Sequence, residues 1–190
     1  MVCKRSKARR QHMKLTINTS FQENTSSPYL LILVDSEHLQ KVASTYKIND
    51  LNTIIEAAQF KSSLTESLTL IGIDKANDLS PAKLAKIAQS IIKASQKKFN
   101  QISIYISALT SEQHYLFAMA LTQANYIFDE YKSKKNHCIL ETIHLISTDS
   151  ALNPQQLNLI HAVQTGQSWA RDLGNRPGNI CFPEYLAEQA

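Results

Sequence analysis

Five short stretches of the chain carry the apolar residues expected of β-strands. Residues 14–18 alternate polar and apolar positions, whereas residues 29–34, with the sequence YLLILV, form a continuous apolar run that ends at Asp35. A continuous run of this length is typical of a strand buried on both faces of a sheet. Similar patterns predict three more strands at 67–73, 101–107 and 139–147.

Segments with apolar residues three or four positions apart predict helices between and after these strands. Ser80-Pro81 and Asn153-Pro154 each combine a capping side chain with a proline suited to the first helical position. Gly174-Asn175 marks a helix end, because both residues accept the backbone conformation that commonly ends helices. The predicted helices cover 36–46, 50–60, 80–98, 111–131 and 153–175, and one more begins at Pro183.

This alternation of strands and helices predicts an α/β fold, with a mixed, largely parallel sheet covered by helices on both faces. We expect the domain to span 13–150 and a long linker helix to follow at 153–175. Ligands of such sheets bind at the carboxyl ends of the strands. Asp35, directly after a buried strand, is therefore a candidate binding residue, although Asp35 and Glu37 are more simply explained as capping the next helix.

The positive charge of the chain is confined to its first residues. The net charge is +4, and five basic residues within 1–12 contribute +5, so residues 13–190 carry 4 − 5 = −1. Residues 1–12 are interpreted as a flexible basic arm or as a mis-annotated start before Met13. DNA binding through this arm would depend on phosphate contacts alone, and the remainder lacks the basic surface that DNA binding requires.

Composition indicates a cytoplasmic globular protein. The sequence has neither the apolar core of a secretory signal nor a run of about 20 apolar residues that could cross a membrane. Its three cysteines are widely spaced, which argues against a disulfide framework and a structural zinc site and favours a reducing compartment. The four glycines are too scattered to form a phosphate-binding loop.

Histidines, cysteines and carboxylates are the candidate sources of chemistry in this sequence. His137, Cys138 and His144 suggest a metal site, but strand alternation favours His144 as a hydrogen-bonded residue of the core or sheet edge. His114 and His161 have no ligand partner four residues further on. Asp129 and Glu130 could form an acid-base pair, yet the lysines at 132, 134 and 135 favour a solvated charge cluster.

The stretch WARDLGNRPGNICFPEYLAEQA, residues 169–190, resembles the segment that opens the catalytic domain of leucyl aminopeptidases. The matching residues are Ala170, Arg171, Asp172, Leu173, Asn175, Pro177, Asn179, Pro183, Leu186 and Ala187. The family usually has two successive prolines where this chain has Pro177-Gly178, a change that loosens the turn. The preceding 150 residues resemble the family in layout, including a front domain similar to macro domains.

The resemblance implies a metal-dependent exopeptidase that removes N-terminal residues, leucine preferred, from peptides with a free N-terminus. It implies two divalent metal ions per site, each of which could be manganese, zinc or magnesium. The ions would activate water and polarise the scissile carbonyl. The family's metal ligands and catalytic residues follow the segment matched here, so we expect residues 176–190 to be a truncated start of the catalytic domain. No residue of this chain is assigned a catalytic or metal role, and the chain alone is expected to be inactive.

The resemblance also implies a hexamer in the complete enzyme, with DNA binding by the front domain in some bacterial members. A different class of function, a free-standing macro-like module that binds a nucleotide or ADP-ribose, is the alternative, although the scarcity of glycine argues against it. A third hypothesis is an interaction module that joins, and so limits, the assembly of a full-length aminopeptidase.

Overall fold

The computed structural model describes residues 13–18, 30–34, 68–73, 78–133, 138–147 and 152–190. The basic arm, both helices predicted within 36–60, Asp35, Glu37 and His137 lie outside the described residues. The elements are β1 (Lys14–Asn18), β2 (Leu30–Val34), β3 (Leu68–Gly72), α2 (Pro81–Ser95), β4 (Gln101–Tyr105), α3 (Ser111–Ala124), β5 (Thr142–Ile146), α4 (Pro154–Asn175) and α5 (Pro183–Gln189).

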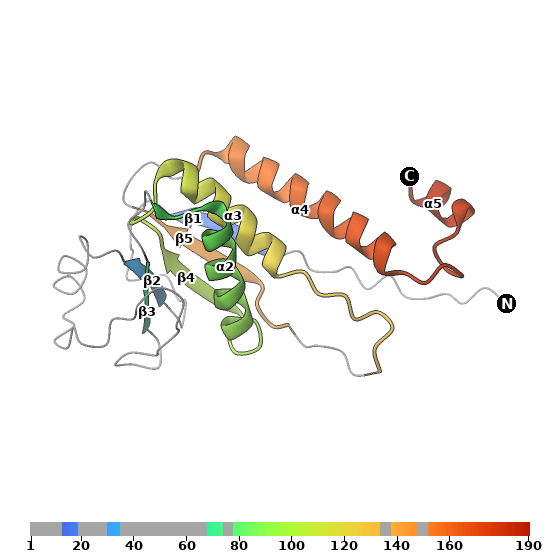
Figure 1. Cartoon of the computed structure of the whole chain (residues 1–190), viewed down its shortest axis with the longest axis horizontal. Coiled ribbons are helices and arrows are strands. Elements are labelled where there is room, and N and C mark those ends of the chain that lie inside the picture. Colours follow the sequence, from blue (N-terminus) through green and yellow to red (C-terminus); the bar gives the residue numbers. More distant parts are fainter. Residues whose placement is uncertain (1–12, 19–29, 35–67, 74–77, 134–137, 148–151) are drawn as a thin grey trace.

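The five strands form one sheet in the order β1-β5-β4-β2-β3 (Figure 1). All four pairings between these strands are parallel. The sheet is therefore parallel throughout the part of the chain that the structure describes, which confirms the predicted α/β class. The edge strand β1 pairs with β5, so the first and last of the described strands are neighbours, with Lys14 opposite Thr142.

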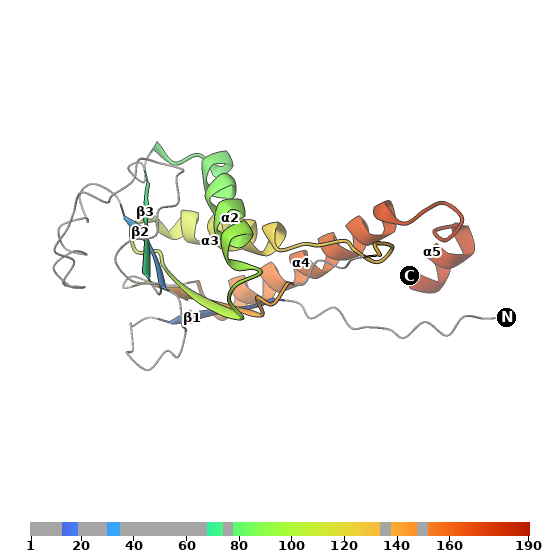
Figure 2. The ribbon, with the colours of Figure 1, turned by 90° about the horizontal axis from the view of Figure 1, so that it is seen from below.

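Helices α2 and α3 pack against each other on one face of the sheet (Figures 1 and 2). Their buried side chains, among them Leu84, Ile91 and Phe117, join one core cluster with Ile102 and Ile104 of β4. Three consecutive residues of β4, Ile102 to Ile104, are buried because the strand lies inside the sheet. This position explains why the strand lacks the alternation of a half-exposed one.

Side-chain caps begin three of the helices. Ser80 Oγ accepts a hydrogen bond from Lys83 N at 3.3 Å, and Asn153 and Gln156 form a reciprocal capping box before α4. Both confirm the starts predicted from a polar residue followed by proline. Thr110 and Gln113 form a second capping box before α3.

Helix α3 and strand β5 differ from the prediction in ways that the structure explains. Helix α3 ends at Ala124 rather than near 131, and residues 125–133 are not helical. Strand β5 begins at Thr142 rather than at 139, because Ile139 N donates to Gln96 O and Glu141 N to Asn100 O. These backbone donors are thus satisfied by the α2–β4 connection, and the segment does not extend the strand.

The long helix α4 packs on α3, and its second half runs past the sheet towards α5, which lies at the far end (Figure 2). Only Ile160 and Gln164 of its 22 residues are buried, and α5 has no buried residue. Of the helices described here, none is long and apolar enough to cross a membrane.

Candidate functional site

His144 lies within the sheet, on β5, beside the edge strand β1. Its Nδ1 is 2.6 Å from Thr16 Oγ1, a hydrogen bond that joins β5 to β1. Burial, and secondarily the positive charge of Lys14, lower the pKa of His144 below its ordinary value of 6.5. His144 is therefore hydrogen-bonded, as predicted, on a strand inside the sheet rather than at its edge, and the folded protein favours the neutral imidazole.

The other candidate metal ligands among the described residues do not gather. Cys138 Sγ is 3.6 Å from Asn125 Oδ1, and His114 Nε2 is 2.9 Å from Ile106 O in the core. In the described ranges no group of three or more His, Cys, Asp or Glu side chains could hold a metal ion. These described residues therefore do not form the two-ion centre that the resemblance implies.

Glu130 has a partner that the sequence did not reveal. Its Oε2 accepts from Arg176 Nη2 at 3.2 Å and from Arg176 Nε at 3.4 Å. The side chains of Arg176 and Glu130 are 19% and 35% exposed, so the ion pair is partly shielded from water. Glu130 therefore lies in an exposed charge cluster, as interpreted from the sequence, and its partner there is Arg176.

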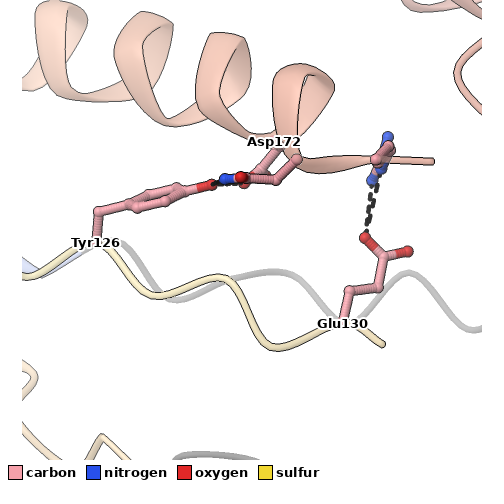
Figure 3. A network of polar contacts seen from close by, with 5 residues as sticks. Tyr126, Glu130 and Asp172 are labelled. Atoms are coloured by element: carbon pink, nitrogen blue, oxygen red, sulfur yellow. Dashed lines mark hydrogen bonds and ion pairs between the residues drawn. The ribbon is translucent and has the colours of Figure 1, made fainter. Parts of the chain in front are cut away.

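A second set of contacts surrounds Tyr126 (Figure 3). The Tyr126 hydroxyl donates to Asp172 Oδ1 at 2.8 Å and accepts from Asn175 Nδ2 at 3.1 Å. Arg171 adds a cation-π contact, with Cζ 5.1 Å from the centre of the Tyr126 ring. Its Nη1 also donates to Gln123 O at 3.2 Å. Arg171, Asp172 and Asn175 of α4 thus all contact Tyr126, on the segment that follows α3.

We name this arrangement the clamp, defined by Tyr126 and Glu130 on the segment after α3 and by Arg171, Asp172, Asn175 and Arg176 at the end of α4. Arg176 continues it to α5, since its Cζ lies 5.1 Å from the centre of the Tyr185 ring. The clamp attaches the C-terminal end of α4 to the segment after α3. The buried residues of α4, Ile160 and Gln164, both lie nearer its start.

The clamp contains three of the residues singled out by their resemblance to the leucyl aminopeptidase pattern, namely Arg171, Asp172 and Asn175. Leu173 is half-buried and Ala170 is exposed. Pro177 O accepts from Ile180 N and from Cys181 N, both at 2.9 Å, so the Pro177-Gly178 sequence forms a closed turn. Asn179 lies within this turn, and Pro183 is the first residue of α5.

The chain is thus an α/β domain whose parallel sheet is followed by a long clamped helix, and comparison with known proteins defines its family. Residues 23–135, more than half of the chain, match the model of the cytosol aminopeptidase family, N-terminal domain. The chain therefore belongs to the cytosol aminopeptidase family. The expected resemblance to leucyl aminopeptidases is confirmed.

Similar proteins carry the same family name. A "Probable cytosol aminopeptidase" of Acinetobacter baumannii is 56% identical over an alignment 190 positions long. The alignment covers 94% of this chain and 39% of that protein. One from Acinetobacter baylyi is 54% identical with the same coverage. The "Cytosol aminopeptidase" of Haemophilus influenzae is 29% identical over 85% of this chain and 33% of that protein. The chain thus spans less than half the length of these relatives.

Solved structures support the fold. A tomato leucine aminopeptidase variant superposes with a TM-score of 0.72 at 16% identity, covering 93% of this chain and 41% of that one. The bottromycin maturation enzyme BotP in complex with Mn has a TM-score of 0.59 at 13% identity, covering 86% of this chain and 35% of BotP. At these identities the likeness concerns the fold alone.

Proposed function

We propose that this chain supplies the N-terminal domain and the connecting helix of a leucyl aminopeptidase. The observation that carries the proposal is the family match over residues 23–135, together with 56% identity to a relative of that name along almost the whole chain. The complete enzyme would release N-terminal residues, leucine among the preferred, from peptides in the cytoplasm.

The proposed domain boundaries follow from the sheet. Strand β5 lies beyond the matched residues, yet it pairs with both β1 and β4 inside the sheet. This pairing supports a proposed domain that includes β5 and ends near 150, with 153–175 as the linker helix and 176–190 as the beginning of the catalytic domain. The clamp supports the assignment of Arg171, Asp172 and Asn175 as structural residues of the family pattern.

The metal chemistry is proposed to reside in the part of the relatives that this chain does not cover. Two divalent ions, manganese or zinc, would supply a water nucleophile and polarise the scissile carbonyl. BotP, a structural neighbour, is in complex with Mn. The contribution of this chain would be to hold the end of α4 in a fixed place, from which a peptidase domain can be positioned, and to take part in a homo-oligomer, a hexamer in the complete enzyme.

A chimera tests this proposal. The equivalent portion of the Acinetobacter baumannii relative is replaced by residues 13–190 of this chain, and hydrolysis of leucine p-nitroanilide is measured with manganese. We expect metal-dependent activity within about tenfold of the unmodified relative. A chimera that folds and remains inactive would contradict the proposed role.

The purified chain alone provides the complementary assay. We expect no turnover of the same substrate, with manganese or with zinc, at protein concentrations where the relative is active. Clear turnover abolished by a chelator would refute the proposal that the metal centre lies outside these 190 residues.

A further inference from the structure

Helix α5 has little apolar contact with the rest of the described structure. None of its residues is buried, and of residues 183–189 Tyr185 alone is half-buried, whereas the others are exposed. The apolar side chains of Phe182 and Leu186 are 44% and 42% exposed. Burial of apolar surface is the usual force that fixes a helix on a domain. The place of α5 therefore depends on the contact that Tyr185 makes.

The connection between α4 and α5 has a fixed shape. Pro177 O accepts hydrogen bonds from Ile180 N and Cys181 N, so residues 177–181 close a turn. Both hydrogen bonds join residues of the turn to each other. They determine the shape of the connection, and the position of α5 relative to the sheet depends on contacts outside the turn.

One guanidinium group provides such a contact. Arg176 Nε and Nη2 both donate to Glu130 Oε2, on the segment that follows α3 (Figure 3). Arg176 Cζ also lies 5.1 Å from the centre of the Tyr185 ring, within the range of a cation-π contact. A planar guanidinium donates hydrogen bonds at its edge and stacks through its face. Arg176 therefore binds Glu130 and Tyr185 at the same time.

The end of α4 is held by different side chains. The Tyr126 hydroxyl bonds to Asp172 and Asn175, and Arg171 lies over the Tyr126 ring. These contacts involve neither Arg176 nor a residue of α5. Loss of the Arg176 side chain should therefore leave the end of α4 in place.

We infer that Arg176 is the positioning residue of α5, which it docks on the α/β layer through Glu130 and Tyr185, independently of the contacts that hold α4. In the complete enzyme the polypeptide after α5 would continue into the peptidase domain, a consequence that rests on the proposed function. Arg176 would then set the orientation of that domain relative to the sheet.

The docking of α5 should be reversible, because both contacts are weak. A partly exposed ion pair and a cation-π contact each favour the bound state by about two- to fivefold. Together they favour it on the order of tenfold, so a minor fraction of the molecules should have α5 released.

Pulsed electron resonance between two nitroxide labels measures the position of α5 in the purified chain. The three cysteines are replaced by serine, and new cysteines carry the labels at exposed positions. Lys93→Cys on α2 with Glu188→Cys on α5 forms the α5 pair. Lys93→Cys with Gly174→Cys, where an added Cβ meets nothing within 4 Å, forms the α4 pair. Each pair should show one main distance in the otherwise unmodified chain.

Removal of the guanidinium should release α5 alone. Arg176→Gln should broaden the distances of the α5 pair, with the docked-to-released ratio lowered about tenfold, and should leave the α4 pair unchanged. Tyr185→Leu retains the ion pair and should lower the ratio about two- to fivefold. The charge reversal Glu130→Arg with Arg176→Glu restores an ion pair without an arginine over Tyr185, and should match Tyr185→Leu.

Lys132→Gln is the matched control, because it removes an exposed cation from the same segment as Glu130. It should leave both label pairs unchanged. Equal α5 distances in Arg176→Gln and Lys132→Gln would overturn the inference. Equal broadening of both pairs in Arg176→Gln would also overturn it, since Arg176 would then hold α4.

Two further results would count against the inference. An α5 pair without a main distance in the otherwise unmodified chain would show that α5 is not docked. A charge reversal that behaves like Arg176→Gln would exclude Glu130 from the docking contact. These distances are measured in the chain alone, and an inactive chimera leaves them unchanged, so failure of this inference and failure of the proposed function are distinguishable.

Discussion

Arg176 and Glu130 form an ion pair of 3.2 Å although 46 positions separate them in the sequence. The pair joins the residue that ends α4 to the segment that follows α3. Arg176 also contacts Tyr185, so one guanidinium lies between the α/β layer and α5. The direction in which the chain leaves α4 therefore depends on this side chain.

Removing this ion pair should have a small effect on stability. Glu130→Gln and Arg176→Gln should each lower the free energy of unfolding by about 0.5 kcal/mol, because partly exposed pairs contribute ~0–1 kcal/mol. Urea unfolding of both single variants and of the double variant measures their coupling. Glu141→Gln, an exposed carboxylate elsewhere, is the matched control. A coupling energy of zero would mean that the two side chains act independently.

Loss of the Tyr126 hydroxyl should loosen the end of α4. Tyr126→Phe removes the donor to Asp172 and the acceptor for Asn175, with an expected cost of about 1–2 kcal/mol for a hydrogen bond to a charged group. The ring and its contact with Arg171 remain. Amide hydrogen exchange should become faster at residues 168–176. Tyr131→Phe, at an exposed tyrosine, should change neither quantity, and equal behaviour of the two variants would argue against the clamp.

Stability should decrease in mildly acidic solution because of His144. The pKa of His144 is lower in the folded chain than its ordinary value of 6.5, so the unfolded chain takes up the proton first as the pH falls. This contribution to stability is fully present above pH 6.5 and is lost as the pH falls towards the pKa of the folded state. The measurement is urea unfolding between pH 7.5 and 5.

His144→Gln replaces the imidazole with a polar side chain that does not titrate, and should flatten the decrease in stability below pH 6.5. His161→Gln, on α4 and outside the sheet, is the comparison variant. An unchanged pH profile in His144→Gln would assign the acid sensitivity to other groups.

The start of α4 should depend on its cap. Asn153→Ala removes the side-chain acceptor for Gln156 N and should cost about 1 kcal/mol, the usual value of a helix cap. Asn153→Asp retains an acceptor and should be close to neutral or slightly stabilising, since a negative charge suits a helix N-terminus. Thermal unfolding of the two variants provides the comparison. A larger loss in Asn153→Asp than in Asn153→Ala would contradict the role of the cap.

Much of the fold could be predicted because its signals are local. The apolar run that ends at Val34 predicted a buried strand, and the polar residue before Pro154 predicted where α4 begins. The end of α3 was less predictable, because the apolar spacing continues to Ile127 whereas the helix ends at Ala124. Residues beyond that point form the clamp, and contacts across the fold determine their conformation.

The clamp itself could not be predicted from spacing. Tyr126 and Glu130 contact residues 46 positions later, and no periodicity relates them. The resemblance to leucyl aminopeptidases pointed to Arg171, Asp172 and Asn175, yet it gave no indication of their partners. Which side of α4 is exposed could not be predicted from the sequence alone, because it depends on the contact of the other side with α3.

The pairing of β1 with β5 has a consequence for synthesis of the protein. Residues 128 positions apart must meet before the edge of the sheet is complete, as with Thr16 and His144. Such distant contacts form slowly because a long loop must close first. The nascent chain therefore carries an unpaired first strand until almost the whole domain has left the ribosome, and during that interval chaperones have the best opportunity to act.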